Sequence, residues 1–349
     1  MRPKSAFRSL LRSLLLAGLG FAGVLGAADT DATAGDFTRG EDLVVRDAAV
    51  AALGDYYGSV VVTDTSNGRV LAMVNQKLAL SSGYMPCSTV KIITGLAALK
   101  EGIVEPEEKI WFKGGWFMTM TEGLAISNNV YFAHLGRKLG FERVKQYAHL
   151  LGFGEKAGWG IEGEQLGEFS ETEHRLGVGR MTSFGDGISA TPLQLAALVS
   201  AVANGGTLYF LQTPRTTDEL RSFTPRIKRE LPLSDVIPGV QPGMLESVQR
   251  GTGKNARAAG QSIWGKTGTC SERENRRRTR LGWFASYNDV ADRKLAVVVF
   301  LKGGYVKGSI AAQIAGDVYR RLSEQHYFAT NAAPRQIVSF GHKTCCSAP

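Results

Sequence analysis

The sequence predicts an α+β protein, an αβα sandwich in which a five-stranded antiparallel sheet is flanked by helices and carries an inserted all-α subdomain. Two runs rich in β-branched residues lie early in the body and three extended runs lie late; they cover residues 58–63, 69–74, 262–269, 281–287 and 295–301. Between the two groups, residues 103–205 have mostly helical patterning. This order favours one sheet that both ends of the body complete together.

Local signals support the individual elements. Asn67-Gly68, between the first two runs, is a hairpin turn signal. Thr191, Pro192 and Gln194 form a capping box with proline at the first helical position, which predicts a helix over 191–203. Apolar periodicity predicts further helices over residues 44–53, 88–100, 125–139, 141–151 and 309–324.

The chain divides into a body and short flanking segments. The elements place the body at residues 58–324, and residues 29–57 are predicted to form a linker and the first helix. Residues 325–349 have little periodicity and are predicted to be a C-terminal tail. The adjacent Cys345 and Cys346 fall in that tail, so we do not expect them at a catalytic site.

The N-terminus predicts export. Basic residues precede an apolar run at 14–25, and the small residues Gly26-Ala27-Ala28 follow it. Residues 1–28 are therefore predicted to be a signal peptide or an N-terminal anchor, and the short run favours a cleaved signal. We expect the body in the periplasm or anchored at the outer face of the cytoplasmic membrane.

The formal net charge is +9, a moderate excess to which the N-terminal segment contributes. Because the other basic residues are scattered, nucleic acid is not an expected partner, whereas an acidic polymer or a membrane surface is compatible with the charge. One basic run, at 273–280, is predicted to be a solvated hairpin loop or a contact with an anionic wall polymer or lipid carrier. The histidines have no spacing that indicates a metal site.

Ser88-x-x-Lys91 is the first candidate catalytic element. It stands at the start of a predicted helix, so Ser88 lies in the first turn and Lys91 lies one turn later on the same face. A serine hydroxyl becomes a good nucleophile when a neighbour takes its proton, and a lysine can do so when burial or nearby positive charge keeps its amine neutral. Alone, the pattern is also typical of an ordinary capping serine and a solvated lysine.

Two further elements follow Ser88-x-x-Lys91 in the chain. Ser127-Asn128-Asn129 lies at a loop-to-helix position, and Lys266-Thr267-Gly268-Thr269 lies at the end of an extended run. Each is weak evidence alone. Together and in this order they match the Ser-x-x-Lys, Ser-x-Asn and Lys-Thr-Gly set of enzymes that form a penicilloyl-serine.

On these motifs the chain resembles the transpeptidase domain of class B penicillin-binding proteins, and the likeness runs from about Ser59 to Arg321. The further matching segments cover residues 58–74, 84–92, 127–132, 151–154, 191–196, 204–206, 265–269 and 282–284. The resemblance implies a β-lactamase/transpeptidase-like fold in which residues 58–324 form the penicillin-binding transpeptidase domain, with the all-α subdomain at about 103–205.

The resemblance also implies roles for five side chains. Ser88 would be the nucleophile and Lys91 its base. Ser127 would relay a proton toward the leaving amine, Asn129 would orient Lys91 and the substrate amide, and Lys266 would supply positive potential.

The same family pattern implies the binding groups. The backbone amides of Ser88 and Thr269 would form the oxyanion hole, and Thr267, Gly268 and Thr269 would bind the substrate carboxylate. The implied substrate is a peptidoglycan stem peptide ending in D-Ala-D-Ala, and β-lactam antibiotics would acylate the same serine. Neither a metal nor a cofactor is implied. A glycosyltransferase of the cell-wall machinery and the membrane surface are the implied further partners.

Cys87 stands where the family usually has glycine, and Cys270 directly follows the Lys-Thr-Gly-Thr element. If the amides of Ser88 and Thr269 point into one oxyanion hole, their cysteine neighbours should be close enough for a disulfide. A similar placement occurs in a group of class A carbapenemases. Two free buried thiols are the alternative.

Two other functions share part of this pattern. A serine β-lactamase, of class D or class A type, would also need a base that activates water, and Glu162 and Glu164 lie in about the right part of the chain. A non-catalytic β-lactam sensor or cell-wall scaffold would keep the fold without turnover. Complete retention of the motif residues argues against pure scaffolding.

Overall fold

The computed structural model describes residues 33–274, 277–290 and 293–329 and has the predicted α+β architecture. Its five-stranded antiparallel sheet has the order β2-β1-β11-β10-β9, so β1 and β11 join the early strands to the late ones. The strands are β1 (Gly58–Asp64), β2 (Val70–Val74), β9 (Ser262–Glu274), β10 (Arg277–Asp289) and β11 (Leu295–Lys302). The predicted signal at 1–28, Cys345 and Cys346 lie outside the described residues.

Both faces of the sheet are buried. Along β1, Val60 and Val62 pack into one hydrophobic cluster and Val61 packs into the other, because successive side chains of a strand point to opposite faces. The central pairing sets Val60 opposite Val299 of β11. The two clusters form the two layers of core between the sheet and its helices.

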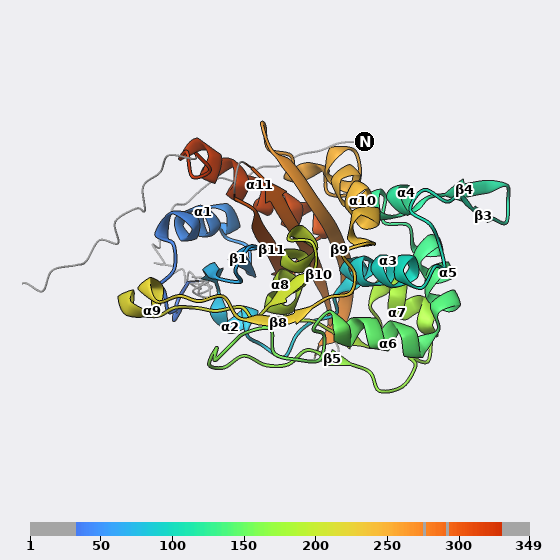
Figure 1. Ribbon diagram of the computed structural model, residues 1–349, viewed down its shortest axis with the longest axis horizontal. Helices are drawn as coiled ribbons and strands as arrows, with labels where there is room; N and C mark the ends of the chain where they lie inside the picture. The colour runs from blue at the N-terminus through green and yellow to red at the C-terminus, as the bar shows by residue number, and fades with distance from the viewer. Residues whose placement is uncertain (1–32, 275–276, 291–292, 330–349) are drawn as a thin grey trace, which may run out of the picture. The chain divides into compact units, whose positions relative to one another are not determined.

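Helices cover the sheet on both sides (Figure 1). On one side lie α1 (Leu43–Leu53) and α11 (Gly308–Glu324), whose apolar residues join the cluster of Val60. On the other side lie α3 (Lys91–Lys100) and α8 (Pro192–Ala203), which is buried along its whole length. The predicted capping box starts α8: Thr191 accepts from the amide of Gln194, whose side chain accepts from the amide of Thr191.

The inserted subdomain is mostly helical, and it also contains short strand pairs. Its helices are α4 (Met120–Ala125), α5 (Asn129–Leu139), α6 (Phe141–Leu150) and α7 (Val178–Phe184). Its strands are β3 (Ile110–Phe112), β4 (Trp116–Met118), β5 (Glu168–Phe169) and β6 (Ile188–Ser189). The β3–β4 hairpin forms because Gly114 and Gly115 take the positive φ angles of its turn, 94° and 76°. The expectation of a purely α-helical insert is corrected accordingly.

The connection from α8 to β9, for which the sequence predicts no clear elements, consists of short strands and helices. They are β7 (Thr207–Tyr209), α9 (Thr217–Arg221), β8 (Ile227–Glu230), α10 (Ile237–Gln249) and the 3₁₀ turn η2 (Lys254–Ala256). A further short helix, α2 (Gln76–Ala79), follows β2.

The predicted loop at 273–280 is a second correction. Its described residues belong to β9 and β10, whose ladder continues from Leu281 opposite Cys270 to Arg277 opposite Glu274. The longer ladder pairs backbone N–H and C=O groups of both segments that a loop would leave to water. The arginine-rich run is therefore largely a two-stranded ribbon that extends the sheet.

No helix among the described residues combines the length and the apolar character needed to cross a bilayer.

Candidate active site

Ser88 lies in η1 (Cys87–Val90), a 3₁₀ turn that runs directly into α3. The predicted helix therefore begins with a tighter turn, and Lys91 is the first residue of its α-helical part. Ser88 is half-buried, and its Oγ donates to the carbonyl oxygen of Ser183 at 3.4 Å. This contact places the hydroxyl beside the end of α7.

Lys91 has no exposed surface. Its Nζ donates to the carbonyl oxygen of Ser127 at 2.7 Å and to Oδ1 of Asn129 at 2.6 Å, and it lies 3.0 Å from Ser127 Oγ. Burial, together with the nearby Lys266 amine, lowers the pKa of Lys91 to about 6. At neutral pH the amine is therefore largely uncharged and can accept a proton.

Lys266 reaches the same point from the sheet. It is a β9 residue with no exposed surface, and its Nζ donates to Ser127 Oγ at 2.8 Å and to the carbonyl oxygen of Thr267 at 3.0 Å. Burial lowers the pKa of Lys266 to about 7. This amine is therefore partly charged near neutral pH.

Ser127 lies between the amines of Lys91 and Lys266 because the helical structure is interrupted at this residue. The sequence predicts one helix over 125–139, whereas α4 ends at Ala125 and α5 begins at Asn129. Ser127 has φ 57°, a left-handed conformation that a helix cannot contain. Asn128 then caps α5 by accepting from the amide of Tyr131 at 2.9 Å.

Four of the predicted catalytic side chains thus form one hydrogen-bonded group at the start of α3; they are Lys91, Ser127, Asn129 and Lys266. A neutral amine one helical turn from a serine can accept the serine proton. A hydroxyl held between two amines can pass a proton from one side of the site to the other. The arrangement is suited to nucleophilic catalysis at a carbonyl.

The Lys-Thr-Gly-Thr element forms one wall of the site along β9. Thr267 Oγ1 donates to Thr252 Oγ1 at 2.6 Å, and Thr269 Oγ1 accepts from the amide of Gly308 at 2.8 Å. A Cβ at Gly268 would lie 3.0 Å from the carbonyl oxygen of Pro86, so glycine allows η1 to approach the strand closely. Sequence analysis missed Thr252, which lies in no motif.

A disulfide joins the two walls. Cys87, directly before Ser88, is bonded to Cys270, directly after Thr269, across 183 residues of sequence. Met85 adds a second connection: its amide donates to the Glu272 carboxylate, and its carbonyl oxygen accepts from Trp283 Nε1 at 2.9 Å. The segment before Ser88 is therefore fixed against β9 and β10 at two residues, Met85 and Cys87.

A cavity of about 440 Å³ opens beside the site. Asn129 and Ser183 are among its lining residues, and Val130, Leu176 and Phe184 give it apolar surface. Its volume is sufficient for a peptide side chain, and its lining residue Ser183 accepts the hydrogen bond of Ser88 Oγ.

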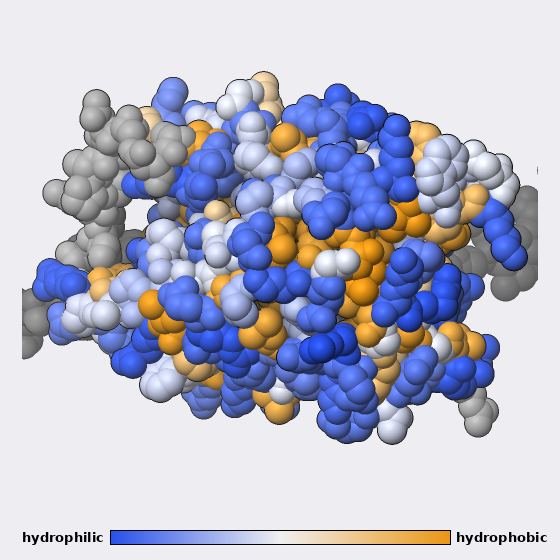
Figure 2. All heavy atoms as spheres, turned by 45° about the vertical axis from the view of Figure 1, so that its right-hand side comes forward, coloured by the Kyte–Doolittle hydropathy of each residue, from blue (hydrophilic) through white to orange (hydrophobic). Residues whose placement is uncertain are grey.

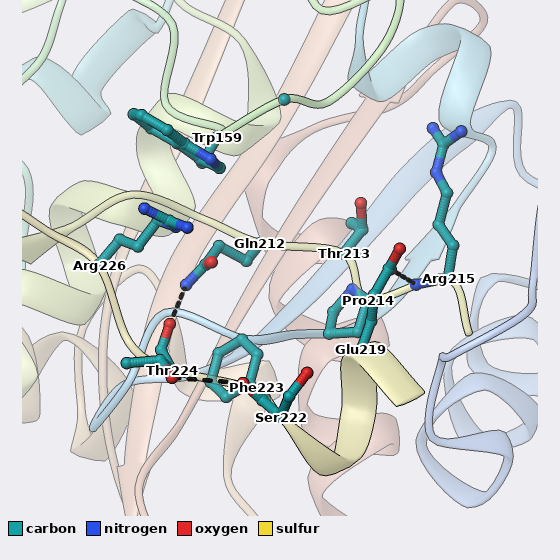
Figure 3. Close-up of a pocket in the computed structure, with 11 residues that line it drawn as sticks. Trp159, Gln212, Thr213, Pro214, Arg215, Glu219, Ser222, Phe223, Thr224 and Arg226 are labelled. Atoms are coloured by element: carbon teal, nitrogen blue, oxygen red, sulfur yellow. Dashed lines mark hydrogen bonds between the residues drawn. The ribbon is translucent and has the colours of Figure 1, made fainter. Parts of the chain in front are cut away.

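A second cavity, of about 500 Å³, lies elsewhere and shares no residue with the predicted motifs (Figure 3). It is lined by the segments 159–160 and 212–226, with Trp159 on one wall and Arg226 stacked over that ring at 4.6 Å. Of these two cavities, the smaller one touches the predicted motifs, through Asn129, which accepts from Lys91 Nζ. Among the described residues, no group of three or more His, Cys, Asp and Glu side chains is arranged to hold a metal ion.

Comparisons with known proteins found similar sequences and folds. A family model for the penicillin-binding protein transpeptidase domain matches residues 58–320. Stage V sporulation protein D of Bacillus subtilis is 31% identical over 281 residues, which cover 71% of this chain and 43% of that protein. The peptidoglycan D,D-transpeptidase MrdA of Acinetobacter baumannii is 24% identical over 365 residues, which cover 81% of this chain and 54% of that protein. The chain thus spans about half the length of these relatives.

Solved structures share the fold. The TP domain of penicillin-binding protein 3 from Burkholderia pseudomallei superimposes with a TM-score of 0.70 at 19% identity, covering 84% of this chain and 96% of that one. A peptidoglycan glycosyltransferase structure from Burkholderia ambifaria gives a TM-score of 0.71 at 18% identity, covering 83% of this chain and 98% of that one.

Proposed function

Because the chain belongs to the family of penicillin-binding protein transpeptidase domains, we propose that it is a serine-type peptidoglycan D,D-transpeptidase. It would cross-link stem peptides ending in D-Ala-D-Ala through an acyl-Ser88 intermediate and bind penicillin covalently at the same serine. One observation carries the proposal: a fully buried lysine with a pKa lowered to about 6 lies one turn after Ser88. The name of the MrdA relative supports the same reaction.

Acylation would proceed by nucleophilic attack. Neutral Lys91 takes the proton of Ser88 Oγ while the oxygen forms a bond to the carbonyl carbon before the last D-Ala. The backbone amides of Ser88 and Thr269 hold the tetrahedral oxyanion. As the peptide C–N bond breaks, Ser127 passes its proton to the leaving D-Ala amine and takes up the one held by Lys91, which leaves the acyl ester on Ser88 and Lys91 neutral again.

Transfer would repeat these steps in reverse. The amine of a neighbouring stem attacks the ester carbonyl, its proton passes through Ser127, and Ser88 Oγ recovers the proton held by Lys91. Attack by water in place of the amine would give a carboxypeptidase. The same residues therefore support both outcomes, and the acceptor decides between them.

Substrate binding would use β9 and the adjacent cavity. β9 stands at the end of the strand order, and a sheet edge can pair with an extended peptide. Thr267, Gly268 and Thr269 would hold the terminal carboxylate, toward which Lys266 supplies positive charge. The cavity lined by Val130 and Phe184 would take more of the stem peptide or the side chain of a β-lactam.

The experiment is mass spectrometry of the intact protein after mixing with penicillin, followed over time. We expect a stable mass increase equal to the whole antibiotic, located on Ser88 and absent from Ser88→Ala. Release of D-Ala from a D-Ala-D-Ala peptide by wild type but not by Ser88→Ala would complete the assignment. A protein that folds normally but gains no mass would contradict it.

Rapid loss of the adduct would instead indicate a serine β-lactamase. The two candidate water-activating carboxylates have other contacts. Glu164 is buried, and its carboxylate accepts from the amides of Ala157 and Gly158 in its own loop. Glu162 is exposed and pairs with Arg215 at 3.6 Å. The buried contacts give Glu164 a structural role and Glu162 stands at the surface, which favours the transpeptidase. A stable adduct without any D-Ala release would indicate the sensor or scaffold.

The protein would be exported and would work with other cell-wall proteins. Residues 1–28 would deliver the domain across the cytoplasmic membrane, where its peptidoglycan substrate is found, as a periplasmic or anchored protein. A glycosyltransferase of the cell-wall machinery would supply the glycan strands. N-terminal sequencing of the mature protein distinguishes a cleaved signal from an anchor, and cross-linking in intact cells tests the partner.

A further inference from the structure

The hairpin of β3 and β4 projects from the body next to α4, at the right of Figure 1. It is rich in aromatic residues, and three of them are well exposed: Trp111 at 64%, Phe117 at 37% and Trp116 at 36%. Figure 2, which turns this end toward the viewer, shows a surface that is largely hydrophilic, with hydrophobic residues gathered in limited areas. Exposed aromatic clusters mark contact sites.

The two faces of the hairpin differ. On the inner face, Met118 is buried and Phe112 packs its ring against His134 of α5, with centroids 5.6 Å apart. On the outer face, Trp111 and Phe117 stand opposite each other in the ladder with ring centroids 5.0 Å apart. The inner face thus fixes the hairpin to the body and leaves the outer pair to solvent.

Basic groups surround the outer pair. Lys109 lies with its Nζ 4.6 Å above the Phe117 ring, and Lys113 is exposed in the turn. Arg137 and Lys138 are exposed on α5, the helix that supports the inner face. The hairpin and its supporting helix therefore both carry exposed basic residues, and Lys109 lies directly on the outer aromatic pair.

The nearest carboxylates in the sequence turn back toward the body. Glu107 accepts from Thr121 Oγ1 at 2.7 Å, and Glu108 accepts from the amide of Glu105 at 3.1 Å. Their contacts hold them at the base of the hairpin, so the tip keeps its basic character.

We propose that the β3–β4 hairpin docks on an anionic membrane, with Trp111 and Phe117 inserted at the interface and Lys109 and Lys113 against the lipid headgroups. Tryptophan favours the boundary between headgroups and acyl chains, where its ring is apolar and its N–H stays solvated. Lysine keeps its charge at headgroup level while its methylenes lie along apolar surface. Nearby basic residues add attraction to anionic lipid, which gives the surface charge complementarity that a neutral apolar partner lacks.

The docking is tested with the full chain and phospholipid vesicles. Vesicles of phosphatidylglycerol and phosphatidylethanolamine are compared with vesicles of phosphatidylcholine in a sedimentation assay. The variant Trp111→Ser/Phe117→Ser is expected to lower the partition coefficient roughly tenfold or more, because two large apolar side chains no longer leave water. Lys109→Gln/Lys113→Gln should weaken binding to the anionic vesicles alone.

A second measurement separates the hairpin from any binding by the N-terminal segment. Residues 1–32 contain no tryptophan, so quenching of tryptophan fluorescence by brominated phospholipid reports only on the rest of the chain. The conservative variant Trp111→Phe should lose most of the quenching while binding persists, since Trp116 stacks on Phe112 at the inner face, away from the inserted pair. The matched control is Trp159→Phe, which removes a tryptophan that is 52% exposed elsewhere and should leave the quenching unchanged.

Equal quenching in wild type and Trp111→Phe would overturn the proposal, whether or not the serine substitutions disturb folding. So would loss of quenching in Trp159→Phe instead, since the lipid-facing surface would then lie at the cavity of Figure 3. Binding that depends on a protein added to the vesicles, and fails on lipid alone, would assign the hairpin to a protein partner and likewise overturn it.

Discussion

The protein buries two groups of charged side chains, and they are built in opposite ways. Arg46 of α1 is buried and donates at 2.8 Å to both Asp36 and Glu41, which are buried with it. Burial opposes the charge of Arg46, but the hydrogen bonds to the two carboxylates outweigh it, so the pKa of Arg46 is raised. The Arg46 cation is therefore held in its charged form, although burial raises the pKa of its partner Glu41.

The two lysines of the candidate active site are also buried, but their positive charge is weakened: Lys91 is largely neutral and Lys266 partly charged near neutral pH. Lys91 and Lys266 direct their hydrogen bonds to hydroxyl, amide and carbonyl oxygens, and burial lowers both pKa values to the neutral range. A buried cation with carboxylate partners contributes to structure, whereas a buried amine with neutral partners is available for proton transfer. The predictions below test this contrast.

The largest expected effect is on catalysis, from Lys91→Met. Removing the base should lower the rate of acylation by penicillin roughly 10²- to 10⁴-fold, because Ser88 then has to lose its proton without a positioned acceptor. Stopped-flow or mass-spectrometric acylation rates measure the effect. Thermal unfolding should change much less than in the Arg46 variant below, since the partners left behind are neutral. An acylation rate within a factor of about two of wild type would rule out Lys91 as the base.

The matching change in the other cluster is Arg46→Met. It leaves the carboxylates of Asp36 and Glu41 buried without their cation, so the free energy of unfolding should fall by roughly 3–5 kcal/mol. Urea unfolding followed by circular dichroism gives the value. The acylation rate of the remaining folded protein should stay near that of wild type. A variant of unchanged stability would show that the cluster does not act as a structural ion pair.

The pH dependence of acylation sharpens the contrast. Because Lys91 must be neutral to accept a proton and its pKa is lowered to about 6, the rate should rise with pH through that region. Below it, the rate should fall about tenfold per pH unit. Lys266→Gln removes a nearby positive charge, so the pKa of Lys91 and the acid limb should move to higher pH.

The control for this shift is Lys109→Gln, which removes an exposed lysine of the β3–β4 hairpin and should leave the limb in place. An acid limb that stays fixed in Lys266→Gln would mean that the Lys266 charge does not act on the base. Acylation rates measured across the pH range for the three proteins distinguish these results.

The same contrast shows what the sequence could and could not predict. The five strands and the order of the three motifs follow from local patterns, so the sheet and the convergence of Ser88, Ser127 and Lys266 were within reach. The interruption of the helix at Ser127 could not be predicted. Its φ of 57° accompanies contacts with Lys91 and Lys266, and serine as a residue type does not favour it.

Other details had different causes. The Gly114-Gly115 pair between aromatic residues is a hairpin signal that could have located β3 and β4. Cys87 has φ 51°, a conformation that favours glycine, which explains why the family usually has glycine there. Thr252 and Ser183 enter the site through contacts over 15 and 95 residues of sequence, and no local pattern marks either residue.

The smallest predicted effect concerns Thr252, which we expect to act as a positioning residue through Thr267. In Thr252→Val the hydroxyl of Thr267 loses the acceptor that lies 2.6 Å away, which is worth about 1 kcal/mol. For a D-Ala-D-Ala peptide, kcat/KM should therefore fall roughly fivefold, mostly through KM, because Thr267 would bind the terminal carboxylate in the ground state as well as in the transition state.

Thr252→Ser keeps the hydroxyl and should restore the wild-type value. Thr224→Val, at the cavity of Figure 3, removes a threonine hydroxyl far from the motifs and should have no effect. A loss that appears in kcat alone, or that serine does not rescue, would show that Thr252 acts on packing rather than on the position of Thr267.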